Sequence, residues 1–210
     1  TEKEAYFFDE FRYKQWLEIK DTDKFQLDHS KKIPPEKFGT VGAVARDNKG
    51  NLAAATSTGG MTNKKFGRIG DSPVIGVGNY ANNSTCAISC TGSGEYFLRA
   101  IVAYDVSSMM EFGGMTLEQA CNKVIHERLL KIGGDGGLIA IDHDGNIQLP
   151  FNTEGMYRAA MDDNGLYSIE IYWLKYNSKD ITSTDLSEIE KLSPQAKICV
   201  VRLDIVIGKP

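Results

Sequence analysis

The sequence lacks the features that mark several large classes of protein. Its 210 residues contain no run of about 18 apolar residues, so no segment is expected to span a membrane, and no signal-peptide pattern is present. Lys and Arg number 24 against 28 Asp and Glu, which gives a formal net charge of -4. Nucleic acids and anionic membranes are bound by basic surfaces, so neither is expected as a partner.

Cysteine and histidine are scarce and are not grouped. The 4 cysteines include no CxxC pair, and Cys86 and Cys90 would share a strand face at about 13 Å, too far apart for a disulfide. We therefore expect free buried thiols, which fit a reducing compartment and favour the cytoplasm, although the sequence leaves the localisation open. The histidines are His29, His126 and His143, whose scatter predicts no metal site.

Composition divides the chain into three parts. Residues 1–39 are dense in charge, with a helix expected from Asp9 to Lys20 and an exposed, cleavable linker around Lys31–Lys37, whose two prolines break regular structure. Residues 40–172 combine β-rich segments with two helices. Residues 173–210 begin with a polar stretch and end in a short apolar strand at Ile198–Ile207, and the role of this tail is not assigned.

The central part predicts paired strands on either side of two helices. The expected strands are Thr40–Asp47, Asn51–Thr58, Val74–Tyr80, Thr85–Thr91, Gly137–Asp142, Asn146–Phe151, Met156–Met161 and Leu166–Tyr172. One helix is expected at Glu95–Met110. The other begins at Thr116, which forms a capping box with Gln119, and ends at Gly133. Helices segregated from antiparallel hairpins imply an α+β fold, with a helical layer packed outside the sheets.

Gly39 and Thr40 stand at the boundary between linker and first strand. A threonine hydroxyl needs an adjacent base to act as a nucleophile, and its own α-amino group can serve when the threonine is N-terminal. That amine has a pKa of about 7.7–8.0, so part of it is neutral near pH 7. Gly39, without a Cβ, tolerates the strained conformation that cleavage of the preceding bond would use. The same pair also fits a threonine that merely begins a strand.

Three further segments carry polar groups that could line a site. Thr56–Lys64 runs from hydroxyls into glycines, which equally fits a turn. In the next segment Arg68 could bind a carboxylate and Asp71 an ammonium group, or the two could form loop ion pairs. Cys90–Glu95 predicts a strand-to-helix turn whose amides would favour a developing negative charge. Its glycines do not complete a dinucleotide or phosphate-binding motif.

Taken together, in this order and spacing, the motifs resemble the plant-type L-asparaginase/isoaspartyl peptidase (β-aspartyl-peptidase) family of N-terminal-nucleophile (Ntn) hydrolases. The matching segments are Gly39–Ala45, Ala53–Lys64, Gly67–Pro73, Cys90–Glu95 and Phe151–Arg158, within a resemblance that runs from Tyr6 to Tyr172. The resemblance implies an αββα sandwich. We expect this sandwich to be incomplete at its N-terminal side, because the family's precursor has a long N-terminal half before the linker. The chain would hold the end of the α part and the β part.

The resemblance also implies the catalytic roles. Thr40 would be the nucleophile, released by self-cleavage of the Gly39–Thr40 bond, and Thr58 its hydrogen-bond partner. The hydroxyl of Thr91 and the N–H of Gly92 would form the oxyanion hole. No cofactor is implied, but a structural Na⁺ or K⁺ is expected from a region absent here.

The substrate-binding residues follow from the same resemblance. Arg68 would bind the α-carboxylate, while Asp71 and the carbonyl of Gly94 would hold the α-ammonium group. The reactive carbonyl would then lie on the side chain, as in L-asparagine and β-aspartyl (isoaspartyl) peptides. The expected function is therefore a self-processing threonine amidohydrolase for these small molecules, assembled as a dimer of processed α/β heterodimers.

Two other functions remain open from the sequence. The chain could be a non-catalytic fragment that keeps an amino-acid-binding pocket. It could also be a glycosylasparaginase, from a sister family that shares several motifs but whose pattern has Asp where Gly39 stands.

Overall fold

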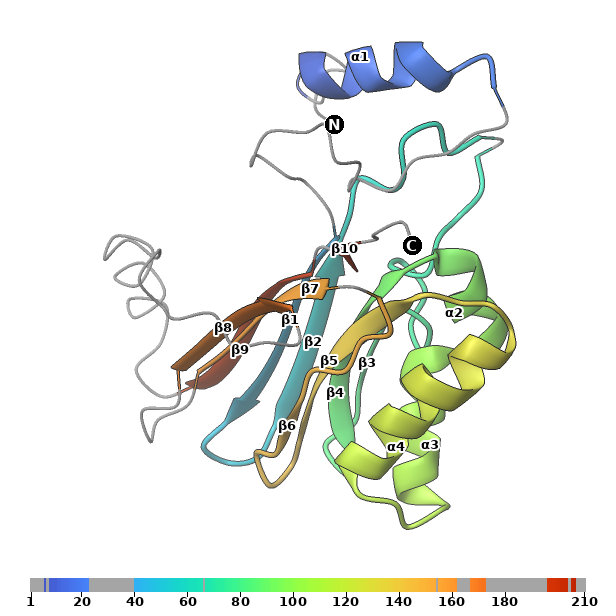
Figure 1. The fold of residues 1–210 in the computed structure, drawn as a ribbon. Coiled ribbons are helices and arrows are strands. Elements are labelled where there is room, and N and C mark those ends of the chain that lie inside the picture. Colours follow the sequence, from blue (N-terminus) through green and yellow to red (C-terminus); the bar gives the residue numbers. More distant parts are fainter. Residues whose placement is uncertain are drawn as a thin grey trace.

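Two β layers stack face to face, and three helices cover the outer face of one of them (Figure 1). The computed structural model describes residues 6, 8–22, 40–65, 67–153, 155–161, 167–172, 196–203 and 205–206. The predicted cleavable linker and Gly39 lie outside these residues.

Along the chain, one helix is followed by four strands, then by the helical segments, and then by the remaining strands. Their bounds are α1 Glu10–Ile19, β1 Thr40–Asp47, β2 Leu52–Ser57, β3 Asn79–Ala81, β4 Cys86–Gly92, α2 Gly94–Ala100, α3 Val102–Glu111, α4 Leu117–Lys123, a π-helical segment Val124–Leu129, β5 Gly136–Asp142, β6 Ile147–Gln148, β7 Gly155–Met161, β8 Tyr167–Tyr172, β9 Ala196–Leu203 and β10 Ile205–Val206. Antiparallel sheets flanked by helices confirm the predicted α+β class.

The strands form three antiparallel sheets with the orders β2-β1-β9, β10-β7-β8 and β3-β4-β5-β6. The predicted tail strand is β9 followed by β10. β9 pairs with β1 along its whole length, from Thr40 opposite Leu203 to Asp47 opposite Ala196. β10 pairs with β7. The C-terminal segment therefore connects the sheet that begins at Thr40 with the sheet of β7 and β8.

Alternating side chains of β4 and β5 build two cores. Ile88 and Leu138 belong to the cluster that packs beneath the helices with Phe97. Ala87 and Ile141 belong to the cluster between the sheets, with residues such as Val44, Phe151 and Met156. Because β4 and β5 are covered on both faces, nearly all of their residues are buried, and the loops at their ends are held between two packed layers.

The predicted long helix over Glu95–Met110 is broken in the structure. Ile101 has φ +51° and separates α2 from α3. The first amides of α3 donate outward instead of along one continuous helix: Ala103 N–H to the carbonyl of Val77, and Tyr104 N–H to that of Gly76. The helical periodicity of the sequence contains no sign of these long-range acceptors, so the prediction of one helix was wrong.

The predicted strand over Val74–Tyr80 is also largely wrong, because only Asn79 and Tyr80 belong to β3. The preceding residues form turns, including a hydrogen bond from Val74 N–H to the carbonyl of Asp71. The predicted strand over Asn146–Phe151 shortens to β6. The capping box of Thr116 and Gln119 is confirmed, as is the helix stop near Gly133, which has φ +80°.

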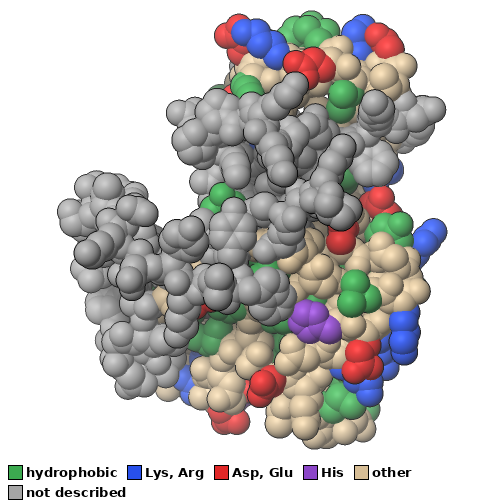
Figure 2. Space-filling view, viewed as in Figure 1, with side chains coloured by type: hydrophobic (Ala, Val, Ile, Leu, Met, Phe, Trp, Pro, Cys, Tyr) green, Lys and Arg blue, Asp and Glu red, His purple; other side chains and the backbone are tan. Residues whose placement is uncertain are grey.

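The remaining expectations concern thiols and surface charge. Cys86, Cys90 and Cys121 are free and buried, as predicted. No helix in the described ranges is long and apolar enough to cross a membrane. In the view of Figure 2, acidic and basic side chains both lie over α1 and over the helical layer, as expected for a chain with a net charge of -4.

Candidate active site

Thr40 is the first residue of β1, and its hydroxyl contacts Thr58. Thr40 Oγ1 donates a hydrogen bond of 3.3 Å to Thr58 Oγ1. β2 ends at Ser57, which pairs with Val41, so Thr58 follows directly beside the start of β1. Thr58 Oγ1 also accepts a 3.0 Å bond from Gly60 N–H. This second bond orients the Thr58 hydroxyl toward the expected nucleophile.

Hydroxyl contacts also join the two β layers near this point. Thr56 on β2 shares a 2.6 Å hydrogen bond with Ser89 on β4 and donates one of 3.1 Å to the carbonyl of Gly78. β2 and β4 both end toward α1 and the loop after β2 (Figure 1). Thr58 and Thr91 each lie two residues beyond the shared bond, at the same end of their sheets. The fold thus directs the expected nucleophile pair and the expected oxyanion hole toward one end of the molecule.

Asp71 is a buried carboxylate whose side chain lacks a full set of partners. Its residue is only 7% exposed, and its Oδ2 has no hydrogen-bond partner among the described residues. Burial raises the pKa of Asp71 to about 6, against the opposing effects of the backbone N–H groups of Asp71 and Ser72 and of the Lys64 ammonium group. A buried acceptor without a donor is unusual in a native protein and fits a site for a cationic ligand.

Gly94 lies directly against this carboxylate. A Cβ at position 94 would stand 2.7 Å from Asp71 Oδ1. Any side chain there would therefore collide with the carboxylate, and glycine is required by close approach. The predicted neighbours Asp71 and Gly94 are brought together as the resemblance implies.

Thr91 and Gly92 end β4 in a tightly enclosed backbone. Thr91 is buried, and Gly92 has φ +153°. A Cβ on Gly92 would lie 2.4 Å from the carbonyl oxygen of Asp135 and 2.5 Å from the ring of Phe97. Packing and conformation both require glycine here. They hold the backbone of Thr91 and Gly92 in one conformation, as a preorganised oxyanion hole requires.

Arg68 is paired within the chain. Its Nη1 lies 3.4 Å from Glu95 Oε2, and both side chains are over a third exposed. Such an exposed pair contributes at most about 1 kcal/mol, so a ligand carboxylate can displace Glu95 at low cost. The predicted carboxylate-binding residue thus has a weakly held internal partner.

Two charged residues that act on Asp71, Lys64 and Glu95, were not assigned by sequence reasoning. Lys64 lies between two glycines, with its Nζ 2.9 Å from where a Cβ on Gly70 would stand and 3.8 Å from one on Gly60. Lys64 lowers the pKa of Asp71 and Glu95 raises it. Both residues lie inside the motifs that carry the resemblance, but their effect on Asp71 depends on the burial of that carboxylate, which the sequence does not show.

No metal centre is found in the described part of the chain, where no group of three or more His, Cys, Asp or Glu side chains could hold an ion. We therefore assign no residue here to the expected Na⁺ or K⁺. Burial raises the pKa values of Cys90 and Cys121 well above the ordinary range, and that of Cys86 to about 12. These three thiols are thus poor nucleophiles.

The fold and site define an α+β protein with a strand-initiating threonine beside a second threonine, and with a buried carboxylate at the same end of the sheets. A model of the asparaginase family matches residues 1–171. The chain therefore belongs to the asparaginase family, and the resemblance inferred from the motifs is confirmed. The match ends before β9 and β10.

Curated relatives agree with this family. The chain is 59% identical over 150 residues to an isoaspartyl peptidase of Salmonella typhimurium, with 70% of this chain and 48% of the relative covered. It is 60% identical over 150 residues to an isoaspartyl peptidase of Escherichia coli, covering 70% and 47%. It is 44% identical over 135 residues to an isoaspartyl peptidase/L-asparaginase of Xenopus laevis, covering 64% and 43%. The chain thus spans about half the length of the curated relatives it matches.

Proposed function

We propose that this chain is a self-processing threonine amidohydrolase that cleaves the side-chain amide of L-asparagine and of β-aspartyl peptides. The observation that carries the proposal is the hydrogen bond from the Thr40 hydroxyl, at the first position of β1, to Thr58. Membership of the asparaginase family and the names of the relatives support the substrate class.

Self-processing would release the base that Thr40 uses. The Thr40 hydroxyl attacks the carbonyl carbon of Gly39, the Gly39–Thr40 C–N bond breaks, and the nitrogen takes up the hydroxyl proton to become an α-amine. Water then hydrolyses the resulting ester, which yields a Gly39 carboxylate and an N-terminal Thr40. The free amine, with a pKa of about 7.7–8.0, is neutral often enough near neutral pH to accept a proton from its own hydroxyl.

Hydrolysis of the substrate would repeat this chemistry. Thr40 Oγ1 attacks the side-chain carbonyl carbon, and ammonia or an amino peptide leaves with a proton from the α-ammonium group of Thr40. The Thr91 hydroxyl and the Gly92 N–H would stabilise the oxyanion, a contribution that is often the largest in acyl transfer. Water then attacks the aspartyl ester and restores the Thr40 hydroxyl.

Substrate selection would rest on the two charged ends of an amino acid. The unpartnered Oδ2 of Asp71 offers an acceptor for an α-ammonium group, and Arg68 offers its guanidinium to an α-carboxylate once Glu95 is displaced. Both groups bind the head of the substrate, so the scissile carbonyl belongs to its side chain. We therefore favour L-asparagine and β-aspartyl dipeptides over α-peptides.

The test is the intact mass of the purified chain, followed over several days at about pH 8, where about half or more of the amine is neutral once formed. We expect two products, residues 1–39 and 40–210, and then ammonia release from L-asparagine. Thr40→Ala should abolish cleavage and lower turnover at least a thousandfold, to roughly the level left when a nucleophile is removed. Ser84→Ala, which removes an exposed hydroxyl in the turn after β3, is the matched control and should behave as wild type.

A Thr40→Ala protein that still releases ammonia would show that the nucleophile is assigned wrongly. A preference for N-glycosyl-asparagine over β-aspartyl dipeptides in direct competition would overturn the proposed substrate class. We also propose that processed chains assemble as a dimer of α/β heterodimers, which light scattering on the cleaved protein tests.

A further inference from the structure

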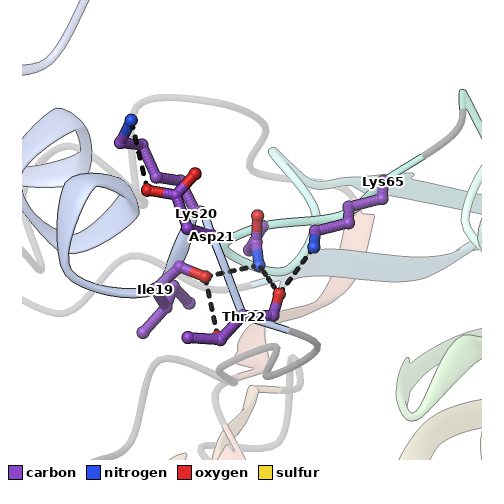
Figure 3. Close-up of polar contacts among 6 residues, drawn as sticks. Ile19, Lys20, Asp21, Thr22 and Lys65 are labelled. Carbon is purple, nitrogen blue, oxygen red and sulfur yellow. Dashed lines mark hydrogen bonds and ion pairs between the residues drawn. The ribbon is translucent and has the colours of Figure 1, made fainter.

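The segment Asn63-Lys64-Lys65 contacts the carboxyl end of α1, more than 40 residues earlier in the chain. Asn63 Nδ2 donates to the carbonyl oxygens of Ile19 at 3.0 Å and Thr22 at 3.3 Å. Lys65 Nζ donates to the carbonyl oxygen of Thr22 at 2.5 Å. Figure 3 shows these bonds converging on Ile19, the last residue of α1, and on Thr22 just beyond it.

The chemistry at the end of α1 explains the contact. The last carbonyls of a helix lack intrahelical donors and carry a partial negative charge. Thr22 already donates its hydroxyl and its N–H to the carbonyl of Ile19, at 2.8 Å and 3.0 Å. Asn63 and Lys65 add an amide and a cation from another part of the chain. Asn63 has φ +62°, a conformation that asparagine tolerates better than most residues.

Lys64, the middle residue of the segment, extends toward Asp71. Its ammonium group lies beside Gly60 and Gly70 and interacts with Asp71. The three-residue segment therefore contacts α1 through Asn63 and Lys65 and the candidate ammonium site through Lys64. A displacement of α1 would therefore move Lys64 as well, because its two chain neighbours, Asn63 and Lys65, are bonded to the end of α1.

We propose that Asn63 and Lys65 form a clamp on the end of α1, which keeps the N-terminal fragment bound after cleavage at Gly39–Thr40 and holds Lys64 in place near Asp71. The inference rests on the proposed function for the cleavage step only. A helix of 10 residues is marginally stable alone in water, because isolated helices shorter than about 12–15 residues seldom form. Once the covalent link is cut, contacts such as these contribute to holding α1 against the rest of the chain.

The first test is hydrogen exchange in the full, uncleaved Thr40→Ala chain, so that it does not depend on processing. Asn63→Gly keeps the left-handed conformation and removes the amide, and Lys65→Met removes the cation. The double variant should increase the exchange rates of amides near the end of α1 about tenfold, because each lost bond contributes modestly to local stability. Lys131→Met, which alters an exposed lysine at the end of the helical layer, should change nothing.

Lys65→Arg should restore most of the protection, since it keeps the cation. Unchanged exchange rates at the end of α1 in the double variant would overturn the proposal. If the double variant does not fold, the exchange rates of the single variant Lys65→Met are compared with those of the parent chain instead. In the cleavable chain, gel filtration should retain the fragment 1–39 with wild-type 40–210 and lose it from the double variant. An uncut wild-type chain would count against the proposed function, while the exchange comparison would still decide the clamp.

Discussion

The two sides of the candidate substrate-binding site are built differently. The ammonium side consists of Asp71 and Gly94, is buried, and is so closely packed that no side chain fits at position 94. The carboxylate side consists of Arg68, whose exposed side chain pairs with Glu95. One half is preorganised by the core, whereas the other is free to exchange an internal partner for a ligand. Keeping the Asp71 carboxylate buried lowers the stability of the folded chain, whereas the exposed Arg68–Glu95 pair has little effect on it.

Asp71→Asn should have the largest effects, in opposite directions for binding and stability. The α-ammonium group of the substrate would lose its only proposed carboxylate partner and would be buried as an unpaired charge. KM for L-asparagine should therefore rise at least about a hundredfold. At pH 8 the variant should unfold less readily than wild type, by up to about 3 kcal/mol, because the shift of the Asp71 pKa from 3.8 to about 6 measures the cost of ionising it. Urea unfolding and steady-state kinetics give both quantities.

The pH dependence follows from the sign of that shift. Below about pH 4 Asp71 is protonated in both folded and unfolded states and costs nothing. As pH rises from about 4 to 6, the folded state binds more protons than the unfolded state, so the free energy of unfolding falls. Asp71→Asn should remove this decline. KM should rise as pH falls through about 6, where Asp71 loses its charge. A wild-type protein whose stability matches the variant at every pH would contradict the buried, ionisable state.

Arg68→Ala should affect recognition with little effect on stability. Loss of a charge-assisted bond to the substrate carboxylate costs about 1.5–3 kcal/mol, which corresponds to a tenfold to hundredfold drop in kcat/KM. The free energy of unfolding should change by less than about 1 kcal/mol, since only an exposed ion pair is lost. A large loss of stability would show that Arg68 belongs to the folded core and would remove the contrast between the two sides.

Glu95→Gln should produce the smallest change. Its carboxylate competes for Arg68 and raises the pKa of Asp71, so its neutralisation should lower KM by a few-fold and shift the pH profile downward. The expected size follows from the weak interaction of exposed pairs. A higher KM in this variant would mean that Glu95 assists binding instead of competing with the substrate.

Local signals predicted the elements whose stabilising contacts are close in sequence. The helix predicted at Asp9–Lys20, the capping box of Thr116 and Gln119, and the strand beginning at Thr40 all follow from neighbouring residues, and the structure has each of them. The break at Ile101 and the turns before Asn79 were missed, because the acceptors for the first amides of α3 lie on a distant loop. Periodicity within a helix cannot indicate such a partner.

The sequence by itself determined the family, the α+β class and the set of residues from Thr40 to Gly94 from which a site can be made, because motif order and local propensity are written along the chain. Only the tertiary structure decided that Asp71 is buried with an oxygen that has no partner in the described part of the chain, that Arg68 pairs with Glu95, and that Asn63 and Lys65 reach the end of α1. Burial and pairing arise where segments far apart in sequence meet. Their electrostatic consequences therefore exist only in the folded chain.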